Sequence, residues 1–329
     1  MKKLSRIIMF VVLTLIMLLP AACTITPEKG SNGLIYELDL LSNSYVVVDY
    51  QAPKDQVVVD EVNYKFLVPE LEIPSSFNGK PVTRIAKGAF RQVYTETRHD
   101  YREYLDFSNG KLTLNKFDEA NGNRSYYAKI QKIVIPASVK TIEDYAFQGC
   151  SELTDVVFDN SISSIGNSAF ASCVSLDTIT LTDKGEAMTG AKTNQLPAGI
   201  KKVSDGMFYN CTSLSEVYIP KTVSKIGKLA FASCSALEDI VIEKADGTDF
   251  VLVGDETEVD MDDKDGVNVT YIDNFAFMGA TSMEYFNVPD SVNKFGVSVF
   301  EMPTPDVADP TTTSSLIGVS FSSAIKELG

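Results

Sequence analysis

A phenylalanine recurs along most of this chain at spacings that share one period, and this recurrence constrains the fold more than any other feature. The spacings are 57, 23, 38, 23, 46 and 23 residues, and the positions are Phe90, Phe147, Phe170, Phe208, Phe231, Phe277 and Phe300. Fixed periods of this size are typical of repeat proteins, whose small units bury apolar residues only by stacking on one another. The 329-residue chain is therefore expected to form an array of stacked units.

Each unit holds the same kinds of residue at the same positions. Alanine precedes most of the phenylalanines, a cysteine follows four of them after three residues, and a leucine comes three residues after each cysteine. Residues 214–227 then read Leu-x-x-Val-x-Ile-Pro-x-x-Val-x-x-Ile-Gly. Because proline cannot donate a hydrogen bond to a strand ladder, it marks the end of a short strand. We expect the apolar residues of this pattern to form the core of the array.

These residues resemble the BspA-like class of bacterial leucine-rich repeats, most closely at 130–153 and 214–237. The resemblance covers about 73–329 and implies a β-rich repeat solenoid of ~23-residue units with short parallel strands. Residues 34–72, which contain the valine runs 46–48 and 57–59, are predicted to be a small N-terminal β cap on the open end of the array.

The first 22 residues have the three parts of a secretory signal. Basic residues near the start precede an apolar run from Ile7 to Leu19, and small residues follow it. At about 1.5 Å per residue this run is too short for a bilayer core of about 30 Å. Residues 1–22 are therefore predicted to be a cleaved signal peptide.

Cys23 follows this signal directly, which resembles the lipobox of bacterial lipoproteins. The departure from that pattern is Pro20, where an aliphatic residue is usual. The resemblance implies lipidation of Cys23, a lipid-anchored tether at 23–33, and a cell-envelope location exposed on the outer surface. The membrane would be contacted through the N-terminal lipid only. The alternative is ordinary cleavage that leaves a free Cys23 thiol.

Composition limits the classes of binding partner and the kinds of metal or catalytic site that this protein can have. The net charge of −15 argues against nucleic acid or an anionic membrane as a partner, so neutral or basic partners are expected. With a single histidine, His99, the sequence offers no multi-histidine metal site. No cofactor, no metal and no catalytic residue are predicted, and His99 beside Asp100 is the one weak sign of an enzyme.

Four cysteines occupy one position of the repeat: Cys150, Cys173, Cys211 and Cys234. Stacked units would place neighbouring cysteines about 5 Å apart, which allows a disulfide on Cα spacing alone. A later copy has Ala280 at this position, which favours a small buried filler. Two interpretations stay open, namely buried thiols or a disulfide such as one between Cys150 and Cys173.

Spacings longer than the period indicate insertions, which in repeat proteins fall in exposed loops that often bind. They are expected at about 91–127, 182–195, 243–268 and 301–315. The first insertion is rich in tyrosine and arginine, residue types enriched at binding hot spots. Its candidate partner-binding residues are Tyr94, Arg98, Tyr101, Arg102, Tyr104, Tyr126 and Tyr127. The alternative is a longer strand pair whose tyrosines pack on the array.

The insertion at 243–268 carries a cluster of carboxylates between Asp255 and Asp265. Carboxylates bind calcium, but an EF-hand loop aligned on Gly266 would start at Met261 and end at Ile272, and neither is a calcium ligand. The cluster is therefore interpreted as a solvated acidic loop, with calcium binding as the alternative.

These features together predict a cell-surface lipoprotein that presents a repeat scaffold for non-catalytic, adhesin-like protein binding. By resemblance, the partners are proteins on a host or neighbouring cell surface. The alternative is glycan capture for nutrient uptake, in which Tyr94, Tyr101 and Tyr104 would stack on sugars.

Overall fold

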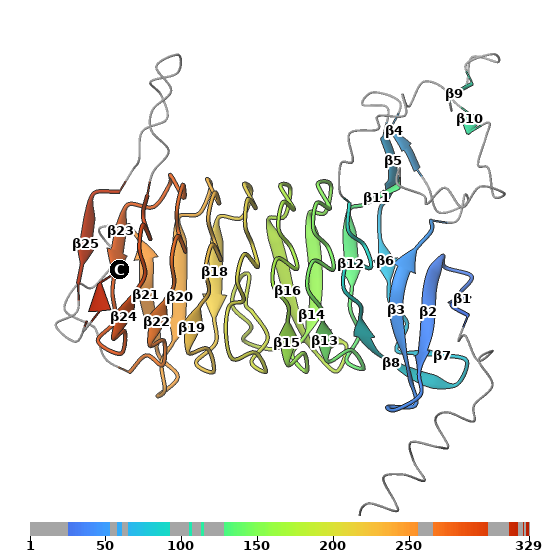
Figure 1. Cartoon of the computed structure of the whole chain (residues 1–329), viewed down its shortest axis with the longest axis horizontal. Coiled ribbons are helices and arrows are strands. Elements are labelled where there is room, and N and C mark those ends of the chain that lie inside the picture. Colours follow the sequence, from blue (N-terminus) through green and yellow to red (C-terminus); the bar gives the residue numbers. More distant parts are fainter. Residues whose placement is uncertain are drawn as a thin grey trace, which may run out of the picture.

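The computed structural model describes residues 26–52, 58–60, 65–92, 105–106, 113–114, 128–255, 266–301, 316–321, 325 and 327–328. Every regular element within these residues is a β-strand, from β1 to β26. Strands of successive repeats lie side by side along one axis, from the N-terminal end on the right of Figure 1 to the C-terminal end on the left. The prediction of a β-rich repeat fold is confirmed.

Repeats 1 to 7 are numbered here by their phenylalanines, in the order Phe90, Phe147, Phe170, Phe208, Phe231, Phe277 and Phe300. The strand that precedes the proline turn of each repeat joins a row that we call the first face. Its strands form two sheets, and their pairings are parallel except those of the inserted strand at 249–254, which are antiparallel. They are β6 (Leu71–Glu72), β12 (Lys132–Val134), β14 (Asp155–Asp159), β16 (Thr178–Asp183), β18 (Glu216–Ile219), β20 (Asp239–Glu243), β21 (Asp249–Gly254), β23 (Tyr285–Asn287) and β25 (Gly318–Ser320).

The strand after the proline turn joins a second row, which we call the second face. Its strands pair in parallel, and Val203 of repeat 4 continues the row through an isolated bridge to Ile226. The strands are β8 (Lys80–Ile85), β13 (Thr141–Ile142), β15 (Ser164–Ile165), β19 (Lys225–Ile226), β22 (Tyr271–Ile272), β24 (Lys294–Phe295) and β26 (Glu327–Leu328). The inward side chains of both faces meet in one core.

The N-terminal strands extend the second face. Strands β1 (Glu28–Lys29), β2 (Leu34–Asp39) and β3 (Ser44–Tyr50) are antiparallel, and β3 pairs in parallel with β8. Strand β7 (Ser76–Phe77) pairs antiparallel with β8. Strand β1 thus lies within the predicted tether, and β6 pairs with β12 from Leu71 onward, just before the predicted start of the repeats. Two small sheets are separate: β4 (Val58–Asp60) and β5 (Lys65–Val68) with β11 (Ala128–Ile130), and β9 (Leu105–Asp106) with β10 (Thr113–Leu114).

The turn around each phenylalanine closes the repeat, and we call it the phenylalanine turn. Its rings stack from repeat to repeat, with centroids 4.9 Å apart between Phe90 and Phe147 and 6.0 Å apart between Phe170 and Phe208. Both of these pairs span an insertion, so the insertions leave the stack intact. The residue before each Ala-Phe pair has a positive φ even where it is bulky, as at Tyr145 (60°), Leu229 (57°) and Phe275 (59°).

This conformation belongs to a backbone ladder that joins each phenylalanine turn to the next one. In repeat 2, the N–H groups of Tyr145, Phe147 and Gly149 donate to carbonyls of repeat 3 at 2.9, 2.8 and 2.8 Å. The same three positions donate to the following repeat from repeats 3 to 6. Positive φ is uncommon outside glycine because Cβ crowds the backbone. The hydrogen bonds of the ladder hold the bulky residues in this conformation.

The four repeat cysteines are free and buried, so the prediction of buried thiols is confirmed. Each thiol donates to the phenylalanine carbonyl of the preceding repeat. The Sγ–O distances are 3.2 Å from Cys150 to Phe90 and 3.0 Å from Cys234 to Phe208. Cysteine therefore fills a small apolar space and supplies a weak donor to a carbonyl that faces the core.

We expect these four thiols to resist a thiol reagent in the folded protein at a pH of about 8, where an ordinary thiol reacts. Burial raises the pKa of Cys150 and Cys234 to about 12, so hardly any reactive thiolate forms. Thiol counting in denaturant without reductant is expected to find all four residues free. A lower count among them would show a disulfide.

Two insertions add structure to the first face. The predicted acidic loop at 243–268 contains β21, which pairs antiparallel with β20 and β23 and buries Phe250, Leu252 and Val253. The insertion predicted at 182–195 forms a hairpin in which β17 (Glu186–Ala187) pairs with β16. It ends at Asn194, which is buried. Parts of both insertions therefore belong to the array.

Asn194 joins two strands of the first face that do not pair directly. Its side-chain oxygen accepts the Ile179 N–H at 2.7 Å. Its side-chain nitrogen donates to the carbonyls of Asp177 at 2.9 Å and Glu216 at 3.1 Å. The amide thus satisfies the buried Ile179 N–H of β16, the carbonyl just before β16 and the carbonyl of the first residue of β18.

Replacing Asn194 with alanine should lower the free energy of unfolding by about 3 kcal/mol, because it leaves buried backbone groups without a partner. Urea denaturation followed by circular dichroism measures this loss. The matched control is Asn293→Ala at an exposed position, for which a change within about 0.5 kcal/mol is expected. Equal losses in both variants would contradict the role of Asn194.

Candidate binding surface

The residues predicted to carry lipid or to bind a partner lie outside the described residues. They are Cys23, Tyr94, Arg98, Tyr101, Arg102, Tyr104, Tyr126 and Tyr127. His99 and most of the acidic cluster, at 256–265, also lie outside them. The predictions made for these residues stay predictions.

The described residues show how the insertion at 91–127 is attached to the array. The chain leaves repeat 1 after Gln92 and returns at β11, which pairs in parallel with β5. Beside this exit, the Lys87 ammonium and the Arg91 guanidinium lie 5.4 and 5.2 Å from the centroid of the Tyr145 ring. A basic and aromatic cluster therefore lies where the insertion leaves the array.

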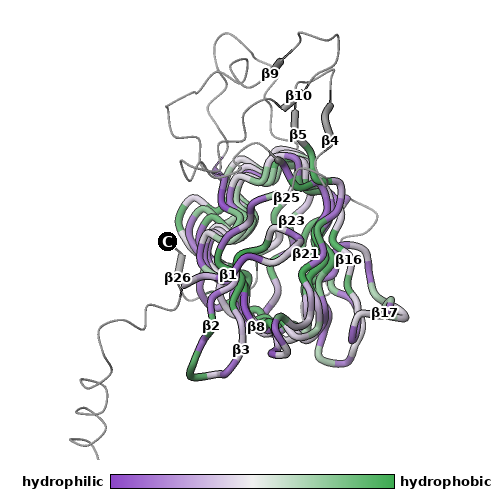
Figure 2. The backbone as a smooth tube through the Cα atoms, turned by 90° about the vertical axis from the view of Figure 1, so that its right-hand side faces the viewer, coloured by the Kyte–Doolittle hydropathy of each residue, from purple (hydrophilic) through white to green (hydrophobic). Residues whose placement is uncertain are grey.

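The two faces differ in the charge of their outward side chains. Near the start of the first-face strands the outward residues include Asp155, Glu216 and Asp239. On the second face, the outward residues that directly precede the buried residue of a strand include Lys202, Lys225 and Lys294. Viewed along the array, β16 and β17 lie on one side of the core, and β2 and β26 lie on the other (Figure 2).

Two rows of side chains run along the second face through repeats 1 to 7, and we call them the lysine rows. The row next to the proline turn is Thr83, Lys140, Ser163, Lys201, Ser224, Thr270 and Asn293. The row beside it is Arg84, Thr141, Ser164, Lys202, Lys225, Tyr271 and Lys294. In these described positions no residue is acidic.

Tyr271 orders the lysines on either side of it. The ammonium groups of Lys225 and Lys294 lie 4.9 and 5.0 Å from the centroid of its ring. Asp273, whose side chain is 14% exposed, accepts the Tyr271 hydroxyl at 2.6 Å and pairs with Lys225 at 2.6 Å. Asp205 is farther from Lys225, at 3.9 Å.

The Asp273 carboxylate has a pKa below its ordinary value. Burial alone would raise this pKa, but the hydrogen bonds from Lys225, Tyr271 and the Asn274 N–H together lower it. Since the folded pKa is lowered, the carboxylate stabilises the fold above the unfolded pKa of about 3.9. This contribution is lost as the pH falls through the folded pKa.

Asp273→Asn should therefore destabilise the protein by about 1–2 kcal/mol at neutral pH, because the ion pair with Lys225 is lost. The difference from the parent protein should shrink as the pH falls below about 4. Denaturant unfolding across this pH range measures the effect. Asp183→Asn, at an exposed position, is the control and should show no such pH dependence. A constant difference for Asp273→Asn would contradict the assignment.

The first face is partly covered by its own insertions. Lys192 pairs with Asp249 at 2.9 Å and lies 5.7 Å from the centroid of the Tyr218 ring. The Tyr218 hydroxyl donates to Asp249 at 2.7 Å. Burial, with a further contribution from Asp249, raises the pKa of Tyr218. This contact joins the insertions at 182–195 and 243–268 over the middle of the first face.

Two other kinds of site, a metal site and a membrane-spanning helix, are absent from the described residues. Among them, no group of three or more histidines, cysteines and carboxylates is arranged to hold a metal ion. None of their elements is a helix with the length and apolar character needed to cross a bilayer. The second face differs from these sites because its lysines occupy equivalent positions of several repeats.

A match to a known repeat family identifies the class of this fold. Six copies of a repeat described as "BspA type Leucine rich repeat region" match residues 121–248 and 259–321, together more than half of the chain. The fold and this repeat define a leucine-rich repeat protein. The chain belongs to the BspA-type leucine-rich repeat family, as its motifs predicted.

Several solved structures are similar to this chain. A leucine-rich repeat protein of T. pallidum is 19% identical, and the match covers 84% of this chain and 91% of that chain at a TM-score of 0.49. A leucine rich cell surface protein from Faecalibacterium prausnitzii is 21% identical over 94% of this chain and 79% of that chain, with a TM-score of 0.37. No curated protein matches the chain. Because these likenesses are distant, the family assignment rests on the repeat match.

Proposed function

We propose that this protein is a cell-surface lipoprotein whose leucine-rich repeat solenoid is a rigid, non-catalytic scaffold for adhesin-like protein binding. In this proposal Cys23 carries the lipid and the insertion at 91–127 makes the main contact. The partner is a protein on a host or neighbouring cell surface. The signal pattern at 1–22 and the membership of a repeat family support this proposal.

The observation that carries the proposal is the continuity of the array across the insertion. Phe90 and Phe147 are 57 residues apart in sequence, yet their rings stack at 4.9 Å and 7°. The frame that holds both ends of the insertion is therefore complete without it. A rigid frame reduces the conformational entropy lost on binding, which favours use of the inserted residues for recognition.

The chemistry of the insertion agrees with this role. Tyrosine and arginine contribute large contact areas and several hydrogen bonds at interfaces. Basic and aromatic residues also lie where the insertion leaves the array, because Lys87 and Arg91 lie over the ring of Tyr145. Contacts of this kind support binding to an acidic or aromatic protein surface.

The triple variant Tyr101→Ser, Arg102→Ser, Tyr104→Ser should weaken binding to a protein partner at least about tenfold, as expected for hot-spot residues. Binding is measured by interferometry against a panel of purified extracellular-matrix proteins and neutral glycans. Tyr209→Ser is the matched control, because this tyrosine is 38% exposed and lies outside the insertion.

Unchanged binding of the triple variant to a matrix protein would contradict the use of the insertion. Binding to neutral glycans alone would replace the adhesin proposal with glycan capture. The unfolding transition of each variant, compared with that of the parent protein, separates a lost contact from a lost fold.

A further inference from the structure

We propose that the lysine rows of the second face bind a linear anionic polysaccharide, one that carries sulfate or uronate groups. This site is distinct from the insertion at 91–127 and does not depend on the function proposed above. Lys201, Lys202 and Lys225 form its centre, in repeats 4 and 5, and Lys294 extends it toward the C-terminal end. Lys228 lies beside the rows, toward the phenylalanine turn.

The charge of this surface differs from that of the whole protein. The chain carries 44 acidic and 29 basic side chains, yet the two rows contain lysines and no acid through repeats 1 to 7. Lys201, Lys202 and Lys228 are exposed. Within the described residues neither Lys201 nor Lys202 takes part in an ion pair. Their charges are therefore accessible to an anionic ligand.

The acids nearest to the rows are engaged with the protein itself. The Asp144 carboxylate accepts the Asn167 N–H at 2.7 Å, and the Asp205 carboxylate accepts the Lys228 N–H at 3.2 Å. Asp273 is held by Lys225 and Tyr271 as described above. These carboxylates follow the second-face strands, toward the phenylalanine turn. Asp205 and Asp273 pair with Lys225, whereas within the described residues no carboxylate forms an ion pair with Lys201 or Lys202.

The net charge of −15 does not prevent such binding. At physiological ionic strength the Debye length is about 8 Å, and two packed sheets lie about 10 Å apart. The outward acids of the first face are separated from the lysine rows by the core, so salt screens much of their effect. A ligand on the second face experiences mainly the local lysines.

The geometry of the surface favours a linear ligand. Neighbouring strands are about 4.8 Å apart, so the lysines of repeats 4 and 5 lie side by side. Lys140 of repeat 2 and Lys294 of repeat 7 lie farther along the same axis. Strands β13, β15, β19, β22 and β24 follow one another along the lower side of the array in Figure 1. Tyr271 holds the ammonium groups of Lys225 and Lys294 over its ring, which orders them before a ligand binds.

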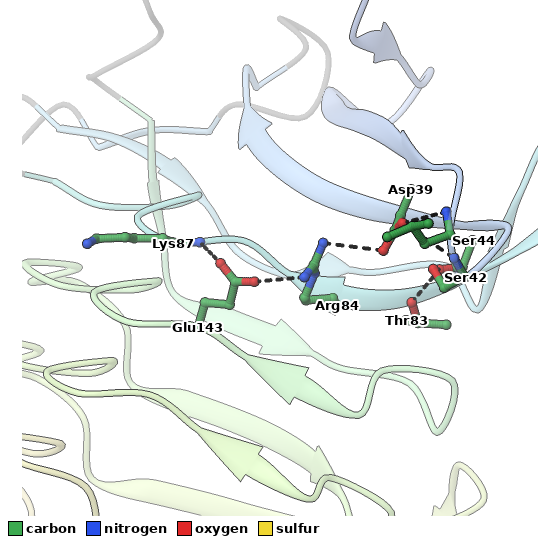
Figure 3. A network of polar contacts seen from close by, with 8 residues as sticks. Asp39, Ser42, Ser44, Thr83, Arg84, Lys87 and Glu143 are labelled. Atoms are coloured by element: carbon green, nitrogen blue, oxygen red, sulfur yellow. Dashed lines mark hydrogen bonds and ion pairs between the residues drawn. The ribbon is translucent and has the colours of Figure 1, made fainter. Parts of the chain in front are cut away.

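The residue types favour a polysaccharide over nucleic acid. Single-stranded nucleic acid is bound through stacking on aromatic rings, often with arginine. The ring of Tyr271 is already in contact with two lysines. Arg84, the arginine of these rows, is held by Asp39 at 3.6 Å and Glu143 at 3.2 Å (Figure 3). Lysine ammonium groups suit scattered sulfate and carboxylate charges.

The test compares binding of the purified full chain to heparin, polygalacturonate, neutral dextran and single-stranded DNA at several salt concentrations. The key variant is Lys201→Gln, Lys202→Gln. Its matched control is Lys132→Gln, Lys184→Gln, which removes the same charge from the first-face strand β12 and from the turn between β16 and β17. Unfolding transitions of both variants check that the fold is intact.

We expect heparin or polygalacturonate to bind and dextran not to bind. The slope of log affinity against log salt should fall by about two in the key variant, one for each lysine, and stay unchanged in the control. No salt-dependent binding to either polyanionic glycan would overturn the proposal, as would equal losses in both variants. Tighter binding to DNA than to both glycans, lost in the key variant, would assign the surface to nucleic acid instead.

Discussion

The backbone ladder between successive phenylalanine turns is the interaction on which the rest of this structure depends. Three N–H groups per repeat donate to the next repeat, and this requires positive φ at residues as large as Leu229 and Phe275. The close approach also explains the small residues nearby. A Cβ on Gly227 would lie 2.8 Å from the backbone nitrogen of Asp205, so a larger residue cannot stand there without a shift.

This constraint acts only at fixed places in each repeat, which is why long insertions are tolerated between them. The rings of Phe170 and Phe208 stack at 6.0 Å although they are 38 residues apart. Two insertions separate neighbouring strands of the first face, and inserted residues supply the missing contacts. Strand β21 pairs with β20 and β23, and the Asn194 amide bridges β16 and β18. At these two insertions, 182–195 and 243–268, the array remains continuous because inserted residues supply hydrogen bonds to the neighbouring strands.

The core and the repeat class could be predicted from the sequence, because each repeated apolar position has the same buried environment. The strand β21 could not, although the alternation of Phe250, Leu252 and their neighbours is a strand signal that the nearby carboxylates obscured. Asn194 carries no repeat signal, since its partners come from distant strands. The lysine rows become visible only when the register places residues such as Lys202 and Lys225 side by side.

The outward positions of the second face also show what the fold does not require. The position of Lys225 is occupied by Thr141, Ser164 and Tyr271 in other repeats, and all of them form the same parallel pairing. Backbone hydrogen bonds and buried residues therefore determine the fold, while these outward side chains are free to vary. Lys201 and Lys202 are exposed and serve no packing role in the described structure. Their concentration in two rows that contain no acid through repeats 1 to 7 of an acidic protein is thus best explained by a ligand that carries the opposite charge.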